Sequence, residues 1–296
     1  MTKDFLFFNY SWVANSTYIF KSIEKMGYSC DFVDEASLPF FKPEHKYKCV
    51  VLYLHEHWTI PITNHLINNF FQDSFLIQHD DTDFFDVQTW GGRVPNLVMQ
   101  RELIDISKTP YPNTPTFPFH FPISSKFDPS ITEKPIDICF LGNMTNPRRA
   151  PFVKKVQELA NGTLKHLNWY LDIGCKSGET TTSQKYIEVI NSSKIGLHYF
   201  GNSYDSWRMW ELASTKTAMI SPHLKLKSIT DKFLPFKNYC IIQDDFQDLE
   251  EKILFMMEND NYKSYAEKSF EDYNKNHTPE KCFEYYLGVI KRYINI

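Results

Sequence analysis

The chain has 296 residues, of which 42% are hydrophobic and 16% aromatic, enough for two domains of ordinary size with substantial cores. Its formal net charge of −4 excludes a strongly basic protein that covers nucleic acid with a whole face, although it leaves room for a local basic groove. The six cysteines are scattered and form no Cys-x-x-Cys pair, so we expect free thiols in a reducing compartment.

The chain start lacks the features of a secretory signal, because its apolar run 5–8 is short and Asp4 follows Lys3. No apolar run is long enough to cross a bilayer. We therefore expect a cytoplasmic protein without a transmembrane segment.

The first half of the chain alternates strand and helix patterns. Apolar runs rich in β-forming residues predict strands at 4–9, 29–33, 49–55, 74–79 and 96–100, and amphipathic patterns predict helices at 16–26 and 62–71. The run at 49–55 is almost wholly apolar, which is typical of a strand buried on both faces. Alternation of this kind predicts a parallel sheet covered by helices.

Prolines crowd residues 109–135, where they occupy positions 110, 112, 115, 118, 122, 129 and 135. Proline fixes φ and removes a backbone donor, so this segment is predicted to be an extended connector. We place the domain junction at 124–135, which gives domains at 1–130 and 131–275 and a final helix at 276–296.

The second half restarts the same alternation. It predicts strands at 136–141, 168–173, 194–200, 217–220 and 239–243, helices at 151–160, 183–192, 207–215 and 249–258, and two or three helices within 262–296. The sequence therefore predicts an α/β protein with two Rossmann-like domains and a helical carboxyl-terminal tail.

The segment 191–222 indicates a ligand site, because it reads as strand, loop, helix and strand. Ser206 stands where a helix N-cap is expected, and a loop between a strand and a helix N-terminus is where open α/β sheets bind phosphorylated ligands. Arg208 and Glu211 share one helix face. The arginine can meet a phosphate, and the glutamate can accept two hydroxyls of a ribose.

This segment resembles the donor-binding segment of group 1 glycosyltransferases of the GT-B fold, in particular the branch of spore-maturation-type proteins. The residues that carry the resemblance are Gly201, Asn202, Tyr204, Asp205, Arg208, Glu211 and Ala213. With falling strength it extends over about 136–290. It implies retaining, metal-independent transfer of a sugar from a nucleotide diphosphate sugar to a hydroxyl acceptor, with the nucleotide sugar bound by the second domain and the last helix crossing back to the first.

The resemblance also implies a charge clamp for the donor diphosphate. Arg148 and Arg149 precede the helix at 151–160, and with Lys154 they match the family's Arg…Lys pair. Gly142 and Asn143 end the preceding strand, where a glycine lets a ligand approach the backbone. Fixed guanidinium groups there, including Arg208, would stabilise the leaving diphosphate.

Glu211 matches the second glutamate of the family's Glu-x7-Glu motif, but the first one is replaced by Ser203. Asp205 is the candidate for the missing sugar contact. Tyr204 suits either stacking on the base or sugar or a place in the core. Ser206 completes the expected donor-binding set.

The acceptor side is expected on loops that follow strands of the first domain, at 9–12, 55–58 and 79–83. Their acidic and imidazole groups could orient an acceptor hydroxyl or take its proton, and His79, Asp80 and Asp81 are the catalytic candidates. The acceptor class stays open among a glycan, a protein, a small molecule and modified DNA.

Two rival interpretations remain. Asp81 and Asp83 form an Asp-x-Asp pattern typical of metal-dependent GT-A glycosyltransferases, and His55, His57 and Asp80 could form a transition-metal site. The second is a nucleotide- or sugar-binding module without activity. We expect a glycosyltransferase without metal or cofactor, for which the nucleotide sugar is a co-substrate.

Overall fold

The structure is a computed structural model of the chain. It describes residues 2–8, 21–34, 36–54, 60–80, 92–101, 109–119, 127–144, 146–174, 183–201, 204, 206–226 and 236–296. The chain divides into two compact units: unit 1 comprises Met1–Pro122 and Pro279–Ile296, and unit 2 comprises Ile123–Thr278.

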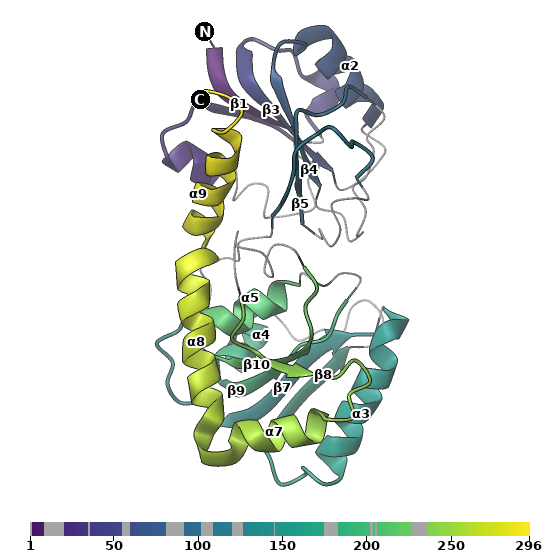
Figure 1. Cartoon of the computed structure of the whole chain (residues 1–296), viewed down its shortest axis with the longest axis vertical. Helices are drawn as coiled ribbons and strands as arrows, with labels where there is room; N and C mark the ends of the chain where they lie inside the picture. The colour runs from purple at the N-terminus through teal and green to yellow at the C-terminus, as the bar shows by residue number, and fades with distance from the viewer. Residues whose placement is uncertain are drawn as a thin grey trace. The chain divides into compact units, whose positions relative to one another are not determined.

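Unit 1 is built on a parallel sheet with the strand order β2-β1-β3-β4-β5-β6 (Figure 1). Its strands are β1 (Thr2–Phe8), β2 (Cys30–Val33), β3 (Lys46–Leu54), β4 (Phe75–Asp80), β5 (Leu97–Gln100) and β6 (Thr116–Pro118). Along β3, Cys49 and Val51 face one apolar cluster and Val50 and Leu52 the other. The two-sided burial expected from the apolar run is therefore confirmed.

Helices from distant parts of the chain cover the two faces of this sheet. Leu66 and Ile67 of α2 (Ile60–Phe70), with the short helix η1 (Leu38–Phe40), cover one face. Phe283 and Tyr286 of α9 (Pro279–Ile290) pack on the other, beside Phe5 of β1. The carboxyl-terminal helix thus completes the core of unit 1 (Figure 1).

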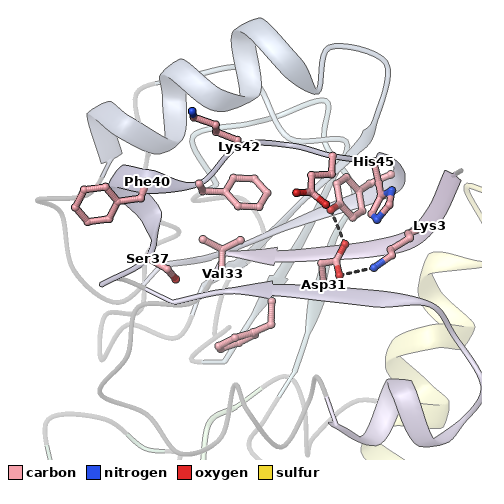
Figure 2. Close-up of a pocket in the computed structure, with 11 residues that line it drawn as sticks. Lys3, Asp31, Val33, Ser37, Phe40, Lys42 and His45 are labelled. Carbon is pink, nitrogen blue, oxygen red and sulfur yellow. Dashed lines mark hydrogen bonds and ion pairs between the residues drawn. The ribbon is translucent and has the colours of Figure 1, made fainter.

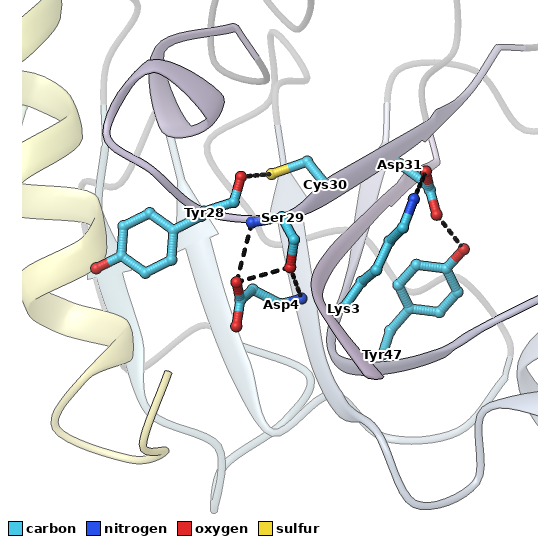
Figure 3. A network of polar contacts seen from close by, with 7 residues as sticks. All are labelled: Lys3, Asp4, Tyr28, Ser29, Cys30, Asp31 and Tyr47. Carbon is cyan, nitrogen blue, oxygen red and sulfur yellow. Dashed lines mark hydrogen bonds and ion pairs between the residues drawn. The ribbon is translucent and has the colours of Figure 1, made fainter. Parts of the chain in front are cut away.

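Polar contacts fix the register at the amino ends of the first strands (Figure 3). Asp31 of β2 accepts from Lys3 Nζ at 2.5 Å and from the Tyr47 hydroxyl at 2.6 Å, which ties β2 to β1 and β3. Asp4 Oδ2 accepts from the backbone N–H and the hydroxyl of Ser29, at 2.9 and 2.8 Å.

Unit 2 contains a second parallel sheet with the order β11-β10-β9-β7-β8 (Figure 1). Its strands are β7 (Ile136–Asn143), β8 (Trp169–Gly174), β9 (Ser193–Leu197), β10 (Ala218–Pro222) and β11 (Cys240–Ile242). Counted along the chain, the five strands of unit 2 follow the doubly wound order 2-1-3-4-5, and unit 1 follows the same order with β6 added at the edge. In unit 2 this order puts the topological switch point between β7 and β9.

The two faces of the unit 2 sheet carry different helices. Helix α3 (Ala150–Asn161), which follows the turn η3 (Pro147–Arg149), packs on one face with α7 (Leu249–Met257) and the start of α8 (Asn261–Asn276). Helices α4 (Ser183–Asn191) and α5 (Trp207–Ser214) pack on the other face. A short turn, η4 (Glu258–Asp260), separates α7 from α8.

The predicted α/β class with two Rossmann-like sheets is confirmed, and most element ends agree with the pattern to within a few residues. The proline-rich segment differs, because it includes β6, which pairs with β5. A strand is possible there because β6 is at the sheet edge, where the donor that Pro118 lacks is not needed for a further strand.

In the part of the chain that the structure describes, no helix combines the length and apolar character needed to cross a membrane. Cys30, Cys49, Cys139, Cys240 and Cys282 are free thiols, as expected from their spacing.

Candidate functional site

The candidate site lies at the carboxyl edge of the unit 2 sheet, at the switch point between β7 and β9. The connection from β7 leads to α3 on one face, and the connection from β9 leads to α5 on the other (Figure 1). Open α/β sheets bind ligands where neighbouring connections diverge in this way.

Backbone groups hold Arg149 at this edge. Its Nε donates to the Phe200 carbonyl at 2.9 Å, and Asn146 Nδ2 donates to the Gly201 carbonyl at 2.6 Å. Gly201 permits the close approach, since a Cβ at this position would lie 2.9 Å from Arg149 Nη2. These bonds join the turn after β7 to the loop after β9.

Arg208, Glu211 and Tyr186 form the second part of the site. Arg208 and Glu211 lie one turn apart on α5, and Tyr186 comes from α4. The Tyr186 hydroxyl donates a short hydrogen bond to Glu211 Oε2, and the Arg208 Cζ lies 6.0 Å from the Tyr186 ring centre. Glu211 is only 7% exposed, so this bond fixes the direction of a largely buried carboxyl.

The two arginines concentrate positive charge at the site. Burial, with a contribution from the charge of Arg208, lowers the pKa of Arg149 to about 10. Burial also opposes the charge of Arg208, but Tyr186 and Glu211 outweigh it and raise the Arg208 pKa. Burial raises the pKa of Glu211, against the Tyr186 bond and the Arg208 charge. Among the described residues Arg208 Nε has no hydrogen-bond acceptor, so the site is suited to an anion.

His198 connects the loop after β9 to the sheet and is completely buried. Its Nδ1 lies 2.9 Å from the Ser221 hydroxyl in β10, and its Nε2 lies 2.8 Å from the Ser206 hydroxyl. Ser206 occupies the N-cap position of α5, but its side chain makes no capping bond. The expectation of a side-chain cap is therefore wrong, because this hydroxyl is bonded to His198 instead.

The other residues expected on the donor side have different surroundings. A Cβ at Gly142 would lie 2.9 Å from the Phe140 ring, so the glycine makes room for its neighbour's side chain. Arg148 is exposed, and the Tyr204 ring packs edge-on against Phe200 with 4.2 Å between ring centres. The Asn143 side chain and all of Asp205 lie outside the described residues.

Two of the expected acceptor-side residues, His79 and Asp80, are the last residues of β4 in unit 1. His79 is 1% exposed, and its ring centre lies 4.9 Å from that of Phe119 and 5.9 Å from that of Tyr286. Burial, helped by the charge of Arg101, lowers the His79 pKa to about 3, which does not suit a group that takes a proton from an acceptor. Asp80 is buried as well, and Asp81 lies outside the described residues.

The residues of the rival metal sites are only partly described. Asp83, His55 and His57 lie outside the described residues, as does Asp81. Within the ranges given above, no three His, Cys, Asp or Glu side chains come together as they would around a metal ion.

A separate hollow of about 620 Å³ lies in unit 1, along the connection from β2 to β3 (Figure 2). On one side the Asp31 carboxylate is held by Lys3 and Tyr47, and on the other Phe40 is 82% exposed. Of the expected donor and acceptor residues that the structure describes, none lines this hollow.

The sequence analysis does not identify three residues that support the arginine site, namely Asn146, His198 and Tyr186. The pair Asn146-Pro147 is a helix-start signal, and Asn146 Oδ1 does accept from the Arg148 N–H at 2.9 Å. His198 stands at the end of an apolar run, where a polar residue next to a strand's carboxyl edge could have been noticed. No sequence pattern indicates that Tyr186 meets Glu211, because the pair comes from two separate helices.

Comparison with known proteins identifies a related family and a shared fold. Residues 148–288, somewhat less than half of the chain, match a family model described as glycosyl transferase-like. This match supports the resemblance to group 1 glycosyltransferases, whereas the spore-maturation-type branch stays a prediction. No curated protein sequence matches the chain.

Solved structures of low sequence identity share the fold. A complex of a S. aureus TarM mutant with Fondaparinux, alpha-GlcNAc-glycerol and UDP has a TM-score of 0.56 at 14% identity and covers 81% of this chain, which spans 55% of TarM. Sucrose-phosphate synthase from Thermosynechococcus elongatus has a TM-score of 0.60 at 8% identity, with 98% of each chain covered. HepE from Anabaena, in complex with UDP and glucose, has a TM-score of 0.58 at 7% identity, with 98% of this chain and 100% of its own covered.

These likenesses establish the GT-B fold. The alternative of a GT-A protein is wrong, because the chain forms two separate parallel sheets, each with its own switch point.

Proposed function

We propose that this protein is a glycosyltransferase that moves a sugar from a UDP-sugar to a hydroxyl acceptor. The observation that carries the proposal is the convergence of Arg149, Arg208 and Glu211 at the switch-point edge of unit 2, within the segment that matches a glycosyl transferase-like family. The TarM and HepE structures contain UDP, which favours uracil as the base of the donor.

Arg149 and Arg208 would bind the donor diphosphate. Sugar transfer leaves a nucleoside diphosphate whose negative charge grows as the glycosidic bond breaks. Two guanidinium groups already held by backbone and side-chain contacts stabilise that charge without rearranging during the reaction. They also make a metal ion unnecessary for charge balance, in line with the metal-independent reaction that the family resemblance implies.

Glu211 would anchor the ribose. A carboxylate can accept from two neighbouring hydroxyls, and the Tyr186 bond holds this one in a fixed direction. Its raised pKa still fits the role, because bound hydroxyls and Arg208 both favour the ionised form. Tyr204 and Asp205 remain our candidates for contact with the sugar, with retention of configuration at its reacting carbon.

The acceptor would bind to unit 1 residues around the end of β4. Asp80 and Asp81 are the proposed orienting groups, whereas the buried, weakly basic His79 is better suited to support them than to exchange protons. A glycan, a protein, a small molecule or modified DNA could supply the hydroxyl.

Turnover of UDP-sugars tests the proposal directly. The purified protein is incubated with UDP-glucose and UDP-N-acetylglucosamine, and UDP release is measured with and without EDTA. We expect EDTA-resistant release that Arg149→Ala and Glu211→Gln each reduce by at least tenfold. Lys165→Ala is the matched control, because this lysine is exposed and lies outside the expected donor-binding set.

Unchanged turnover in both site variants would refute the assignment of the site. Tight UDP binding without release from any UDP-sugar would instead support a binding module that has kept the fold.

A further inference from the structure

A buried histidine sets the start of helix α5, next to the arginines of the donor site. His198 follows β9 directly and contacts two hydroxyls, Ser221 in the neighbouring strand β10 and Ser206 at the N-cap position of α5. It therefore connects the rigid sheet to the first residue of the helix that carries Arg208 and Glu211.

The hydrogen bonds define which nitrogen of His198 carries the proton. The Ser221 hydroxyl lies 3.0 Å from the Pro222 carbonyl, and a carbonyl can only accept, so Ser221 donates there. Its oxygen is then left to accept from His198 Nδ1. Burial, together with the charges of Arg208 and Arg149, lowers the His198 pKa to about 3, so the ring is neutral at physiological pH. Nε2 is thus an acceptor, and Ser206 donates to it.

In this arrangement the Ser206 side chain does not cap helix α5. An N-cap serine accepts from the N–H of the second or third helical residue, which here are Arg208 and Met209. The Met209 N–H instead contacts the Ser206 carbonyl at 3.2 Å, and the Ser206 hydroxyl is held by His198. A capping serine would accept from the Arg208 N–H. This N–H lies at the positive end of the helix dipole, beside two guanidinium groups.

We propose that His198 is a positioning residue that holds the Ser206 hydroxyl away from the first turn of α5, so that the donor diphosphate rather than a serine cap meets the Arg208 N–H. This inference rests on the proposed function of the site. The Arg208 Nε, a buried donor with no acceptor among the described residues, is independent support for an anion at this helix start.

A histidine suits this role better than a carboxylate. An aspartate or glutamate here would also accept from Ser206, but its negative charge would neutralise the arginines and repel the diphosphate. Neutral imidazole is an acceptor without charge. The site therefore keeps its positive character while the serine is held in place.

Two substitutions separate the contacts of His198. In His198→Gln the longer amide can keep an acceptor near the position of Nε2, whereas in His198→Asn the shorter amide can reach only toward Ser221. We expect His198→Asn to weaken UDP binding on the order of fivefold, the effect of a serine cap competing for the first turn, and His198→Gln to bind nearly as the unmodified protein does. The readout is the UDP dissociation constant from calorimetry.

The decisive variant removes the competing hydroxyl. If His198 acts by restraining Ser206, then Ser206→Ala restores UDP affinity to His198→Asn, so that the double variant binds UDP as Ser206→Ala alone does. A general packing defect would not be rescued in this way. Ser193→Ala is the matched control for Ser206→Ala and should not restore UDP affinity to His198→Asn. It deletes a buried serine hydroxyl at the opposite end of β9, where Ser193 donates to the Val189 carbonyl.

Failure of the double variant to regain affinity would overturn the proposal, and so would unchanged UDP binding in His198→Asn. The ¹⁵N spectrum of the imidazole tests the same idea without any ligand, because a proton on Nε2 instead of Nδ1 would contradict it even if His198→Asn did not fold. Absence of UDP binding in the unmodified protein would refute the proposed function, and the tautomer would still test the role of His198.

Discussion

At the residue scale, the site depends on a contact that only glycine permits. The Arg149 guanidinium lies against the Gly201 backbone, where a methyl group would be 2.9 Å from Nη2. Real Cβ contacts this short force one partner to move. The position of the arginine is thus fixed partly by a residue with no side chain.

Gly201→Ala should therefore displace Arg149 and weaken UDP binding by about tenfold or more, the effect of disturbing a charge-assisted hydrogen bond. Gly288→Ala is its matched control, because no atom lies within 4 Å of the added Cβ and the residue is exposed on α9. We expect the control to keep UDP affinity and to gain about 1 kcal/mol in stability from helix propensity. Equal UDP affinity in both variants would contradict the proposed packing of Arg149.

Burial lowers the pKa of both His79 and His198, and this predicts a loss of stability in acid. The pKa of His79 falls from 6.5 to about 3 on folding, chiefly through burial, so between these pH values the unfolded chain binds a proton that the folded chain does not. Stability must then decrease as pH drops from about 6.5 toward 3. Urea unfolding at pH 7 and pH 5 checks this, and His79→Gln should lose less stability between these two pH values than the unmodified protein. An equal loss in both would show that His79 does not titrate in this way.

Sequence patterns identify the charged members of the site but not their supports. Arg149, Arg208 and Glu211 are recognisable because each stands at a set distance from a strand or helix end. His198 and Tyr186 act through contacts between elements that are distant along the chain, and single-sequence periodicity carries no information about such pairs.

At the element scale, α9 belongs to unit 1 although it follows unit 2 in the chain. Phe283 is fully buried among residues of β1, β3 and β4, while Glu284, the next residue, is exposed and pairs with Lys281 at 2.7 Å. Substitutions at these two neighbouring residues therefore measure the contributions of core packing and of surface charge to stability separately.

We expect Phe283→Ala to lower the free energy of unfolding by about 3–5 kcal/mol, because it removes a buried ring and leaves a cavity. Glu284→Ala should change stability by less than about 1 kcal/mol, as exposed ion pairs do. Urea titration followed by circular dichroism measures both. Comparable values for the two variants would mean that α9 does not complete the core of unit 1.

The alternation of strands and helices was predictable, since each element carries its own periodicity. The short strand β6 was not predictable. Its sequence is rich in proline, which is unfavourable for a strand in general, but β6 is at the sheet edge and pairs on one side only. Strand order was also beyond the sequence, since it depends on which apolar faces meet. The switch point between β7 and β9 follows from that order alone.

At the scale of the whole molecule, the two sheets share the order of their first five strands but differ in their carboxyl edges. Unit 2 gathers two arginines and a glutamate at its switch point, whereas β4 of unit 1 ends in a buried histidine and a buried aspartate. This difference agrees with the proposed roles, in which unit 2 binds an anionic donor and unit 1 binds an acceptor.

Arg149 and Arg208 are proposed to recognise a diphosphate, and the affinities of UDP and uridine for the protein test this recognition. Calorimetric titration of the unmodified protein should give UDP an affinity at least a hundredfold above that of uridine, and Arg149→Ala should lose most of this difference while still binding uridine. If UDP does not bind, or if the preference for UDP over uridine survives in both Arg149→Ala and Arg208→Ala, the two arginines do not form the donor site.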